Sequence, residues 1–368
     1  MRFRDKNGPL HHPILKPASL PDFLTVARIE AALDLSRMFL DTTCVKANIH
    51  FPVDWVLMRD GVKSLMQSVE LIRSHGLKSR MCEPQEFITK INRLSMEMTH
   101  TRRKKNSNKE RKRVLREMKR VVTVVRAHAQ RYYTLLDKNW QATDWTRPQA
   151  EQVLKRIKSV IEALPAAVKQ AHERIIGERQ VANDEKILSL FEPDIHVIVR
   201  GKAGEEVEFG NLLVLGEQID GLIMDWELFK EQVPADPRLV RPSVERVENG
   251  LALSLKGLIT DRGFDNKTNV TWLEERGIFA GLCPRDPRAL REAMKDEDFA
   301  QAQHRRAQTE ARVAIFKNEF LGRPMRSEGF ENRALQVAWG VLTHNLWVLA
   351  NKLREQRKIR EQKLRKAA

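Results

Sequence analysis

The sequence predicts an α/β protein in which a mixed sheet is interrupted by a large helical insertion. Its 368 residues are 42% hydrophobic and 31% charged, which is enough apolar material for a sizeable core. Short β-rich runs bounded by turn residues occur near residues 38–51 and after residue 195. Between them, residues 55–187 hold few Gly or Pro and carry apolar side chains at helical spacing. We therefore expect helices between the first and second strands.

The first strand is expected to end at an acidic residue. Residues 38–40 and 45–51 have β character, and Asp41 follows the first of these runs. The carboxylate of Asp41 is therefore expected at a strand end.

Several helices are predicted in the insertion, and the longest spans roughly residues 109–136. Its apolar positions recur every three or four residues, which is the pattern of a helix with one buried face. The residues expected in this buried stripe are Val114, Leu115, Met118, Val121, Val122 and Val125.

After the insertion the chain is expected to return to the sheet. β-branched runs and five glycines between residues 201 and 221 predict hairpin strands. A short apolar strand at 257–260 is followed by Asp261, so a second carboxylate is expected at a strand end. The other predicted elements are helices at 237–249, 267–276, 296–321 and 331–366 and a strand at 278–283.

The C-terminal helix is expected to turn one apolar face to the core. Trp339 and Trp347 on this helix are also expected to pack inside the protein. The other residues predicted to face inward are Leu335, Ala338, Val341, Leu342, Leu346, Leu349 and Leu353.

Four segments follow from these patterns. They are an N-terminal segment with the first strand (1–54), a basic helical insertion (55–190), the remainder of the sheet-containing core (191–330) and a basic helical C-terminal tail (331–368).

The excess positive charge is concentrated in two stretches. The formal net charge is +16, from 65 Lys or Arg against 49 Asp or Glu. Residues 101–120 hold eleven basic and two acidic residues, and residues 351–368 hold eight and two, which gives net charges of +9 and +6. Such runs bind phosphates without reading sequence, which makes nucleic acid the leading partner. An isolated run of this kind is as often a solvated helix face.

Other protein classes are disfavoured. Cys44, Cys82 and Cys283 are too few and too scattered for a disulfide framework or a zinc cluster. The N-terminus lacks the apolar core of an export signal, and no stretch reaches the roughly 18 apolar residues of a bilayer helix. A cytoplasmic protein without a membrane partner is expected.

The two strand-end acids and a third acid on a later helix are candidates for a metal site. Arg306 precedes Glu310 by four residues and Lys317 follows it by seven, so they lie about 40° and 20° from Glu310 and all three share one face of a regular helix. Acids that end neighbouring strands, with a third from a helix on the sheet, can hold two divalent cations for phosphoryl transfer. Taken alone, an Arg, Glu and Lys stripe is usually a surface salt-bridge pattern.

Five motifs occur in order along the chain. They are DTTCVKANIHFPVDW from residue 41, RDGVKSLM from residue 59, FEPDIHVIVRGKAGEEVEFG from residue 191, DRGFDNKTN from residue 261, and the spacing of Arg306, Glu310 and Lys317. In this order they resemble the insertion-sequence transposases of the DDE superfamily. The resemblance extends from about Met38 to the C-terminus.

The resemblance implies a ribonuclease-H-like catalytic core in which Asp41, Asp261 and Glu310 bind two Mg²⁺ or Mn²⁺ ions, with Asp41 bridging them. The implied reaction is metal-dependent strand cleavage and strand transfer at the ends of an insertion sequence. The implied partners are double-stranded DNA, at the element ends and the target, and a second copy of the chain. The implied location is the cytoplasm of a prokaryote, at the nucleoid. The residues expected to contact DNA, from the motifs and the basic run, are Arg306, Lys317, Arg262, Arg102, Arg103, Lys104, Lys105, Arg111, Lys112 and Arg113.

Two departures from the family pattern leave alternatives open. Related transposases carry a Tyr three residues before the position of Arg306, where this chain has Gln303. They also carry a helical N-terminal region that contacts the element ends, whereas forty residues precede Asp41 here. The chain is then an inactive or N-terminally shortened DNA-binding remnant, or it uses the helices of the insertion for these contacts. A nuclease of the same fold without strand transfer is a third alternative.

Overall fold

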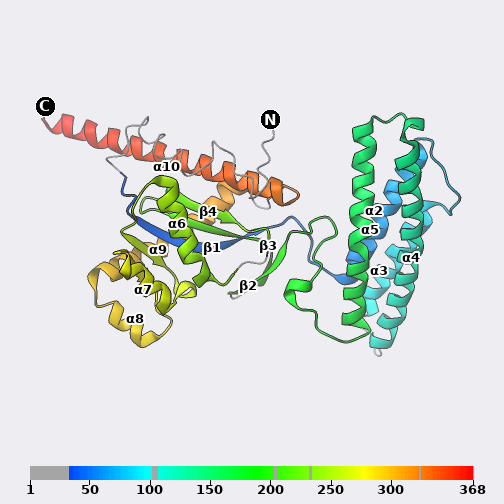
Figure 1. Ribbon diagram of the computed structural model, residues 1–368, viewed down its shortest axis with the longest axis horizontal. Coiled ribbons are helices and arrows are strands. Elements are labelled where there is room, and N and C mark those ends of the chain that lie inside the picture. Colours follow the sequence, from blue (N-terminus) through cyan, green and yellow to red (C-terminus); the bar gives the residue numbers. More distant parts are fainter. Residues whose placement is uncertain (1–32, 102–106, 203–204, 232–233, 323–324, 368) are drawn as a thin grey trace. The chain divides into compact units, whose positions relative to one another are not determined.

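A computed structural model describes residues 33–101, 107–202, 205–231, 234–322 and 325–367 (Figure 1). The chain forms two compact units. The sheet unit contains the described residues up to Asn48 and from Ile198 onward, and the helical unit is Ile49–Val197. The sequence placed these two boundaries at residues 54 and 190, whereas the structure places them at residues 48 and 197.

The sheet unit is built on a mixed sheet, which confirms the predicted α/β class. In the described residues the sheet has six strands, and β1 lies at its centre. β1 pairs antiparallel with β3 on one side and parallel with β5 on the other, and β4 adds to β3. The strands are β1 (Arg37–Lys46), β2 (His196–Lys202), β3 (Glu205–Glu217), β4 (Ile223–Leu228), β5 (Gly257–Thr260) and β6 (Phe279–Leu282).

Asp41 lies in the middle of β1, not at its end as expected. The parallel pairing of β1 with β5 stops at Leu40 and Thr260, but the antiparallel pairing with β3 continues as far as Lys46. The long β3 therefore extends β1 beyond the point where the sequence pattern suggested a break. From Asp41 onward, β1 is paired with β3 but no longer with β5. The edge of β1 that faced β5 is therefore free of that pairing at Asp41.

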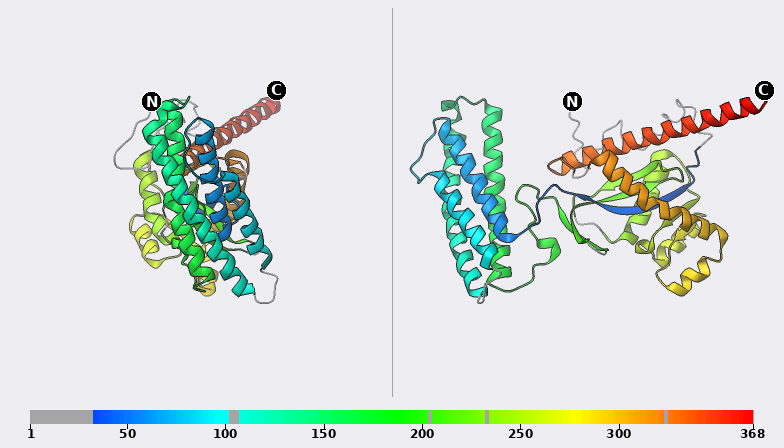
Figure 2. Two further views of the ribbon diagram at one scale, coloured as in Figure 1. Left: turned by 90° about the vertical axis from the view of Figure 1, so that its right-hand side faces the viewer. Right: turned by 180° about the vertical axis from the view of Figure 1, so that it is seen from behind.

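Helices cover both faces of the sheet. α6 and α7 pack on the face that includes Met38 and Leu40 of β1, and α9 packs on the other face, where its Ala302 meets Phe39 and Ile259 (Figure 2). Because side chains alternate along a strand, Asp41 shares the α9 face with Phe39. The helical elements of this unit are α6 (Val240–Leu251), α7 (Lys267–Glu275), α8 (Pro287–Ala293), α9 (Glu297–Ile315), the π-helical turn η7 (Phe316–Leu321) and α10 (Phe330–Ala367).

The C-terminal helix α10 corrects two predictions. It is not a separate segment, because Val337 and Val341 pack with strands β3 and β4 in the core of the sheet unit. The residues expected inside are also only partly there. Four of them are exposed, because the helix is apolar on more than one side: Leu335, Trp339, Leu346 and Trp347.

The helical unit is a bundle of four long helices (Figure 1). The predicted stripe of α4 is buried in its core from Val114 to Val125, as the helical period required. Asp54 is buried at the start of the bundle, where its carboxylate accepts hydrogen bonds from Arg174 at 2.9 Å and Gln170 at 2.9 Å. None of the described helices combines the length and apolar character needed to cross a bilayer. The bundle helices are α2 (Asp54–Ser74), α3 (Pro84–Thr101), α4 (Ser107–Asn139) and α5 (Arg147–Ile175).

Candidate active site

Two of the predicted acids meet at the point where β1 and β5 separate. Leu40 and Thr260 are the last parallel pair, so Asp41 and Asp261 are the next residues on adjacent strands. Asp261 then caps a short 3₁₀ turn, and its Oδ1 accepts a hydrogen bond from the backbone N–H of Gly263 at 2.8 Å. Oδ1 of Asp41 accepts a hydrogen bond from the N–H of Thr42 at 2.7 Å. The backbone therefore holds both carboxylates beside each other.

The third acid reaches the same place from α9. Arg306 places one guanidinium nitrogen 3.5 Å from Oδ2 of Asp261 and 3.9 Å from Oε1 of Glu310. The side chain of Arg306 is largely buried, whereas that of Glu310 is 63% exposed. Glu310 therefore lies at the open side of the cluster and Asp41 at its floor.

Electrostatics confirm that the three carboxylates influence one another. The pKa of Asp41 is raised from its ordinary value of 3.8 to about 6, first by burial and then by the negative charge of Asp261, with a smaller contribution from Glu310. The N–H of Thr42 and the guanidinium of Arg306 act in the opposite direction. The acids predicted to act together are thus brought together by the fold.

The donor set suits a hard divalent cation. Carboxylate oxygens are the ligands that Mg²⁺ and Mn²⁺ prefer. In this structure the positive charge among these acids comes from Arg306. Its Nε is buried without a hydrogen-bond partner among the described residues. In the described part of the chain, no three His, Cys, Asp or Glu side chains are arranged so that they could hold an ion. The ligand types of the acids fit such a metal, but their side chains are not arranged around an ion in this structure, where Arg306 lies between Asp261 and Glu310.

Gln303 holds α9 against the sheet. Its amide nitrogen donates hydrogen bonds to the carbonyl oxygens of Gly281 at 2.8 Å and Thr260 at 3.4 Å. These carbonyls belong to β6 and β5. Gln303 therefore positions the helix that carries Arg306 and Glu310.

Lys317 reaches the site from outside the regular helix. The sequence prediction assumed an α-helix as far as residue 321, but α9 ends at Ile315 and continues as the π-helical turn η7. Within this turn Nζ of Lys317 donates a hydrogen bond to Oγ1 of Thr43 at 3.2 Å. Thr43 lies two residues after Asp41 on the same face of β1. Lys317 therefore lies beside the acids even though the helical period is broken.

The turn after Asp261 is tightly built. The guanidinium of Arg285 donates hydrogen bonds to the carbonyl oxygens of Arg262 at 2.9 Å and Gly263 at 2.7 Å. The side chain of Arg262, a predicted DNA contact, is exposed. A Cβ at Gly263 would lie 2.7 Å from a carboxylate oxygen of Asp236. Sequence reasoning missed Asp236, because it starts a short 3₁₀ turn and follows no strand.

Gly263→Ala is expected to impair the site without unfolding the protein. The new Cβ would also lie 2.9 Å from Oδ1 of Asp261, so that carboxylate must shift. Because both close atoms are ends of side chains, we expect the unfolding free energy to change by less than about 1 kcal/mol. If the acids act as the sequence predicts, the rate of metal-dependent DNA cleavage should fall about 100-fold, since small displacements of catalytic groups have effects of that size. Thermal melting and cleavage rates measured on the same preparation check this, and a fully active variant would contradict it.

The basic residues of the helical unit that were predicted to contact DNA fall into two groups. Arg102, Arg103, Lys104 and Lys105 lie outside the described residues. The other three already have partners within the unit. Arg111 lies over the ring of Trp55 at 5.7 Å, Lys112 pairs with Glu178 at 2.7 Å, and Arg113 contacts Glu97, Glu110 and Glu117.

A different set of cations on α4 faces solvent. Lys109, Arg116 and Arg120 are exposed and lie within about 40° on one side of the helix. Among the described residues they form no ion pair with an acid. Unlike Lys112 and Arg113, whose charges are paired with acids, this stripe is an accessible positive surface on α4.

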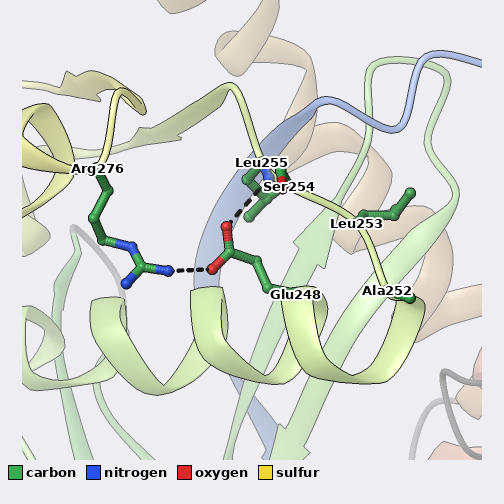
Figure 3. Close-up of a pocket in the computed structure, with 6 residues that line it drawn as sticks. All are labelled: Glu248, Ala252, Leu253, Ser254, Leu255 and Arg276. Carbon is green, nitrogen blue, oxygen red and sulfur yellow. Dashed lines mark hydrogen bonds and ion pairs between the residues drawn. The ribbon is translucent and has the colours of Figure 1, made fainter.

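A separate pocket lies at the end of α6 in the sheet unit (Figure 3). Arg276 contacts Glu248 at 2.5 Å, and the other oxygen of Glu248 accepts a hydrogen bond from the N–H of Leu255 at 3.3 Å. The two charges neutralise each other and hold the loop in which Ala252 adopts a left-handed conformation, with φ of 51°. None of the predicted site residues lines this pocket, so we assign it a structural role.

No protein-family model matches this chain, and comparisons with curated proteins and with solved structures find no match either. What the chain does has to be inferred from its own residues.

Proposed function

We propose that this chain is a DNA transposase of the DDE superfamily, which cleaves DNA strands and transfers them at the ends of an insertion sequence. One observation carries the proposal: Asp41, Asp261 and Glu310, from distant parts of the chain, lie around the guanidinium of Arg306. An acid cluster of this composition is suited to two-metal phosphoryl transfer.

The architecture supports a ribonuclease-H-like core. β1 is central, parallel to β5 and antiparallel to β3, and helices cover both faces. The first two acids are adjacent across the parallel pair, and the third comes from the helix above them. The helical unit is inserted between β1 and β2.

The proposed cofactors are two Mg²⁺ or Mn²⁺ ions, which supply an activated nucleophile and stabilise the leaving oxygen. Asp41, held deepest in the cluster, would be the ligand shared by both ions, and Asp261 and Glu310 would each complete one site. Arg306 and Lys317 would turn to the phosphates of the bound strand. Gly263 allows the close turn that keeps Asp261 in place.

Double-stranded DNA is the proposed partner, at the element ends and at the target, with a second copy of the chain in the synaptic complex. This assignment places the protein at the nucleoid in the cytoplasm. The exposed stripe of Lys109, Arg116 and Arg120 is the proposed DNA-binding surface of the helical unit. Binding through such a stripe depends on charge and not on base sequence.

Neutralising this stripe is expected to weaken DNA binding at every sequence equally. Arg116→Gln with Arg120→Gln should reduce the slope of log affinity against log salt by about 2, because each lost phosphate contact removes about one released counterion. Lys138→Gln, at the other end of α4, is the matched control and should leave the slope unchanged. Fluorescence anisotropy with a labelled duplex at several salt concentrations measures the slopes. An unchanged slope in the double variant would exclude this surface.

Glu310→Gln is expected to abolish strand cleavage in Mg²⁺. The substrate is a plasmid that carries the DNA flanking the coding sequence, and the matched control is Glu297→Gln at the exposed start of the same helix. We expect the Glu310 variant to lose at least about 1,000-fold in cleavage rate, since a ligand of the catalytic ions is removed. The control should cleave at the rate of the unaltered protein.

The same assay separates the alternatives. A chain that binds the plasmid but never cuts it in Mg²⁺ or Mn²⁺ is a DNA-binding remnant. A chain that cuts but yields no joined target DNA is a nuclease. Equal cleavage by the Glu310 variant and the unaltered protein would exclude the triad.

A further inference from the structure

Arg285 fastens the turn after β5 to the loop after β6. These strands are adjacent and parallel, so the chain leaves both of them at the same edge of the sheet. Nε of Arg285 donates a hydrogen bond to the carbonyl oxygen of Arg262 at 2.9 Å, and Nη2 donates one to the carbonyl oxygen of Gly263 at 2.7 Å. The backbone N–H of Arg285 donates a third bond, to Oδ2 of Asp265 at 2.8 Å. One residue therefore makes three hydrogen bonds to the turn that follows Asp261.

One peptide group connects Arg285 to the carboxylate of Asp261. This 262–263 peptide group contains the carbonyl oxygen of Arg262 and the N–H of Gly263. The carbonyl oxygen accepts the bond from Arg285, and the N–H donates to Oδ1 of Asp261 at 2.8 Å. Among the described residues no other group donates a hydrogen bond to this carboxylate, and Arg306, 3.5 Å from Oδ2, contacts it as an ion pair. The orientation of the 262–263 peptide group therefore determines how Oδ1 is held.

Arg285 is the stronger constraint on this peptide group. Within the turn, the carbonyl oxygen of Arg262 also accepts from the N–H of Asp265, but at 3.4 Å. That distance is longer than the roughly 2.7–3.2 Å of ordinary N–H···O bonds. A donor on a carbonyl oxygen also polarises the amide, which strengthens its N–H as a donor. A guanidinium can serve two neighbouring carbonyl oxygens at once, because its N–H groups are fixed in a planar fork.

We propose that Arg285 is a positioning residue for Asp261 and acts through the 262–263 peptide group. Its importance for cleavage rests on the proposed function, in which Asp261 is one of the three acids. The hydrogen bonds of Arg285 go to the turn and not to these acids. Two of its three guanidinium nitrogens are committed to carbonyl oxygens. This is why we assign Arg285 a role within the protein and not as a contact for DNA phosphates.

Hydrogen exchange of the Gly263 N–H tests the positioning role without a cleavage assay. In the full chain labelled with ¹⁵N-glycine and kept in a chelator, NMR spectra contain at most 17 glycine signals, and the signal of Gly263 is identified by its loss in Gly263→Ala. We expect Arg285→Ala to raise the exchange rate of this N–H at least about 10-fold, because the turn loses two hydrogen bonds and opens more often. Arg285→Lys should raise it similarly, since an ammonium group lacks the fork.

Two controls separate this effect from a loss of charge and from general unfolding. Arg288→Ala removes an exposed cation three residues further along, whose side chain forms no hydrogen bond or ion pair among the described residues. It should leave the exchange at Gly263 unchanged. The N–H of Gly340, which is buried in α10 of the same unit, should exchange at the same rate in every variant.

Cleavage of the plasmid in Mg²⁺ measures the consequence for the reaction. Loss of a group that orients a catalytic carboxylate costs about 10- to 100-fold in activity. We expect kcat to fall by that factor in Arg285→Ala and in Arg285→Lys, with the KM for DNA nearly unchanged. Arg288→Ala should keep the kcat of the unaltered protein.

Unchanged exchange at Gly263 in both Arg285 variants would overturn the proposal. If DNA binding is weaker in these variants while the exchange is unchanged, Arg285 is a phosphate contact instead. Full cleavage by a variant whose Gly263 N–H exchanges faster would overturn the role in cleavage. If the unaltered chain never cleaves the plasmid, the proposed function fails, and the exchange still decides whether Arg285 holds Asp261 in place.

Discussion

Asp41→Asn is expected to abolish metal-dependent strand cleavage and, at the same time, to stabilise the metal-free protein. The carboxylate of Asp41 is buried beside Asp261 and Glu310, and its pKa is raised from 3.8 to about 6. At neutral pH the Asp41 carboxylate is therefore ionised in both states, and its charge costs more free energy in the folded protein than in the unfolded chain. Removing that charge should raise the free energy of unfolding by about 2 to 3 kcal/mol at pH 7.5.

The pH dependence gives this prediction its sign. Between pH 3.8 and about 6 the folded state binds more protons at Asp41 than the unfolded state does, so this group makes stability fall as the pH rises. Below pH 3.8 both states are protonated and the penalty disappears. The stability difference between the Asn variant and the unaltered protein should therefore be largest above pH 6 and close to zero near pH 4.

Urea unfolding at pH 7.5 and pH 4, in the presence of a chelator, measures this difference. Asp137→Asn, an exposed position on α4, is the control and should change stability by less than about 0.5 kcal/mol. A destabilised Asp41 variant at pH 7.5 would contradict the burial of this carboxylate among other acids. A gain in stability with loss of cleavage is typical of a group kept for function.

Glu217→Ala is expected to have the largest effect on stability. Glu217 is 5% exposed, at the end of β3. Its carboxylate accepts hydrogen bonds from Arg305 at 3.1 Å and Thr309 at 2.9 Å, and Arg312 lies 3.8 Å away. These three residues belong to α9, so Glu217 fastens to the sheet the helix that carries Glu310.

Removing Glu217 leaves two guanidinium groups without their acid. Breaking a buried ion pair on one side costs about 3 to 5 kcal/mol, and we expect a loss near the lower figure because Arg312 is partly exposed. Glu292→Ala removes an exposed pair with Lys295 and should cost less than about 0.5 kcal/mol. Thermal and urea unfolding of the two variants check the contrast. Equal melting temperatures would show that Glu217 does not anchor α9.

Local signals were sufficient to predict most elements of the sheet unit. β5 was expected at residues 257–260 and is found there, and α7 begins at Lys267 as expected. Asn266 caps that helix by accepting a hydrogen bond from the N–H of Thr268 at 2.8 Å. Such caps and periods depend on a few neighbouring residues, which is why they can be recognised in a single sequence.

Features that depend on distant partners were missed. The length of β1 depends on β3, which arrives after the whole helical unit, so Asp41 was wrongly placed at a strand end. The side of α10 that faces the core depends on β3 and β4, and the apolar pattern alone did not reveal that Leu335 and Leu346 point outward. The π-helical turn that carries Lys317 breaks a period that looked regular.

The sequence predicted how many positive charges the basic run carries, but not which of them are free of acidic partners. The basic run of α4 was identified, but Lys112 and Arg113 are neutralised by acids from other parts of the chain or from neighbouring turns. Arg116 and Arg120, which were not singled out, are exposed and form no ion pair with an acid among the described residues. Pairing depends on which helices meet, and this cannot be read from a count of residues.

Binding of Mn²⁺ to the full chain, followed by the rise in melting temperature on titration, tests the shared metal site most directly. At a hundredfold excess over its dissociation constant, the ion should stabilise the unaltered protein by about 2.7 kcal/mol. We expect Asp41→Asn, Asp261→Asn and Glu310→Gln each to remove most of this stabilisation, while Glu297→Gln retains it. Undiminished stabilisation by Mn²⁺ in any one of the three acid variants would contradict a site that these carboxylates share.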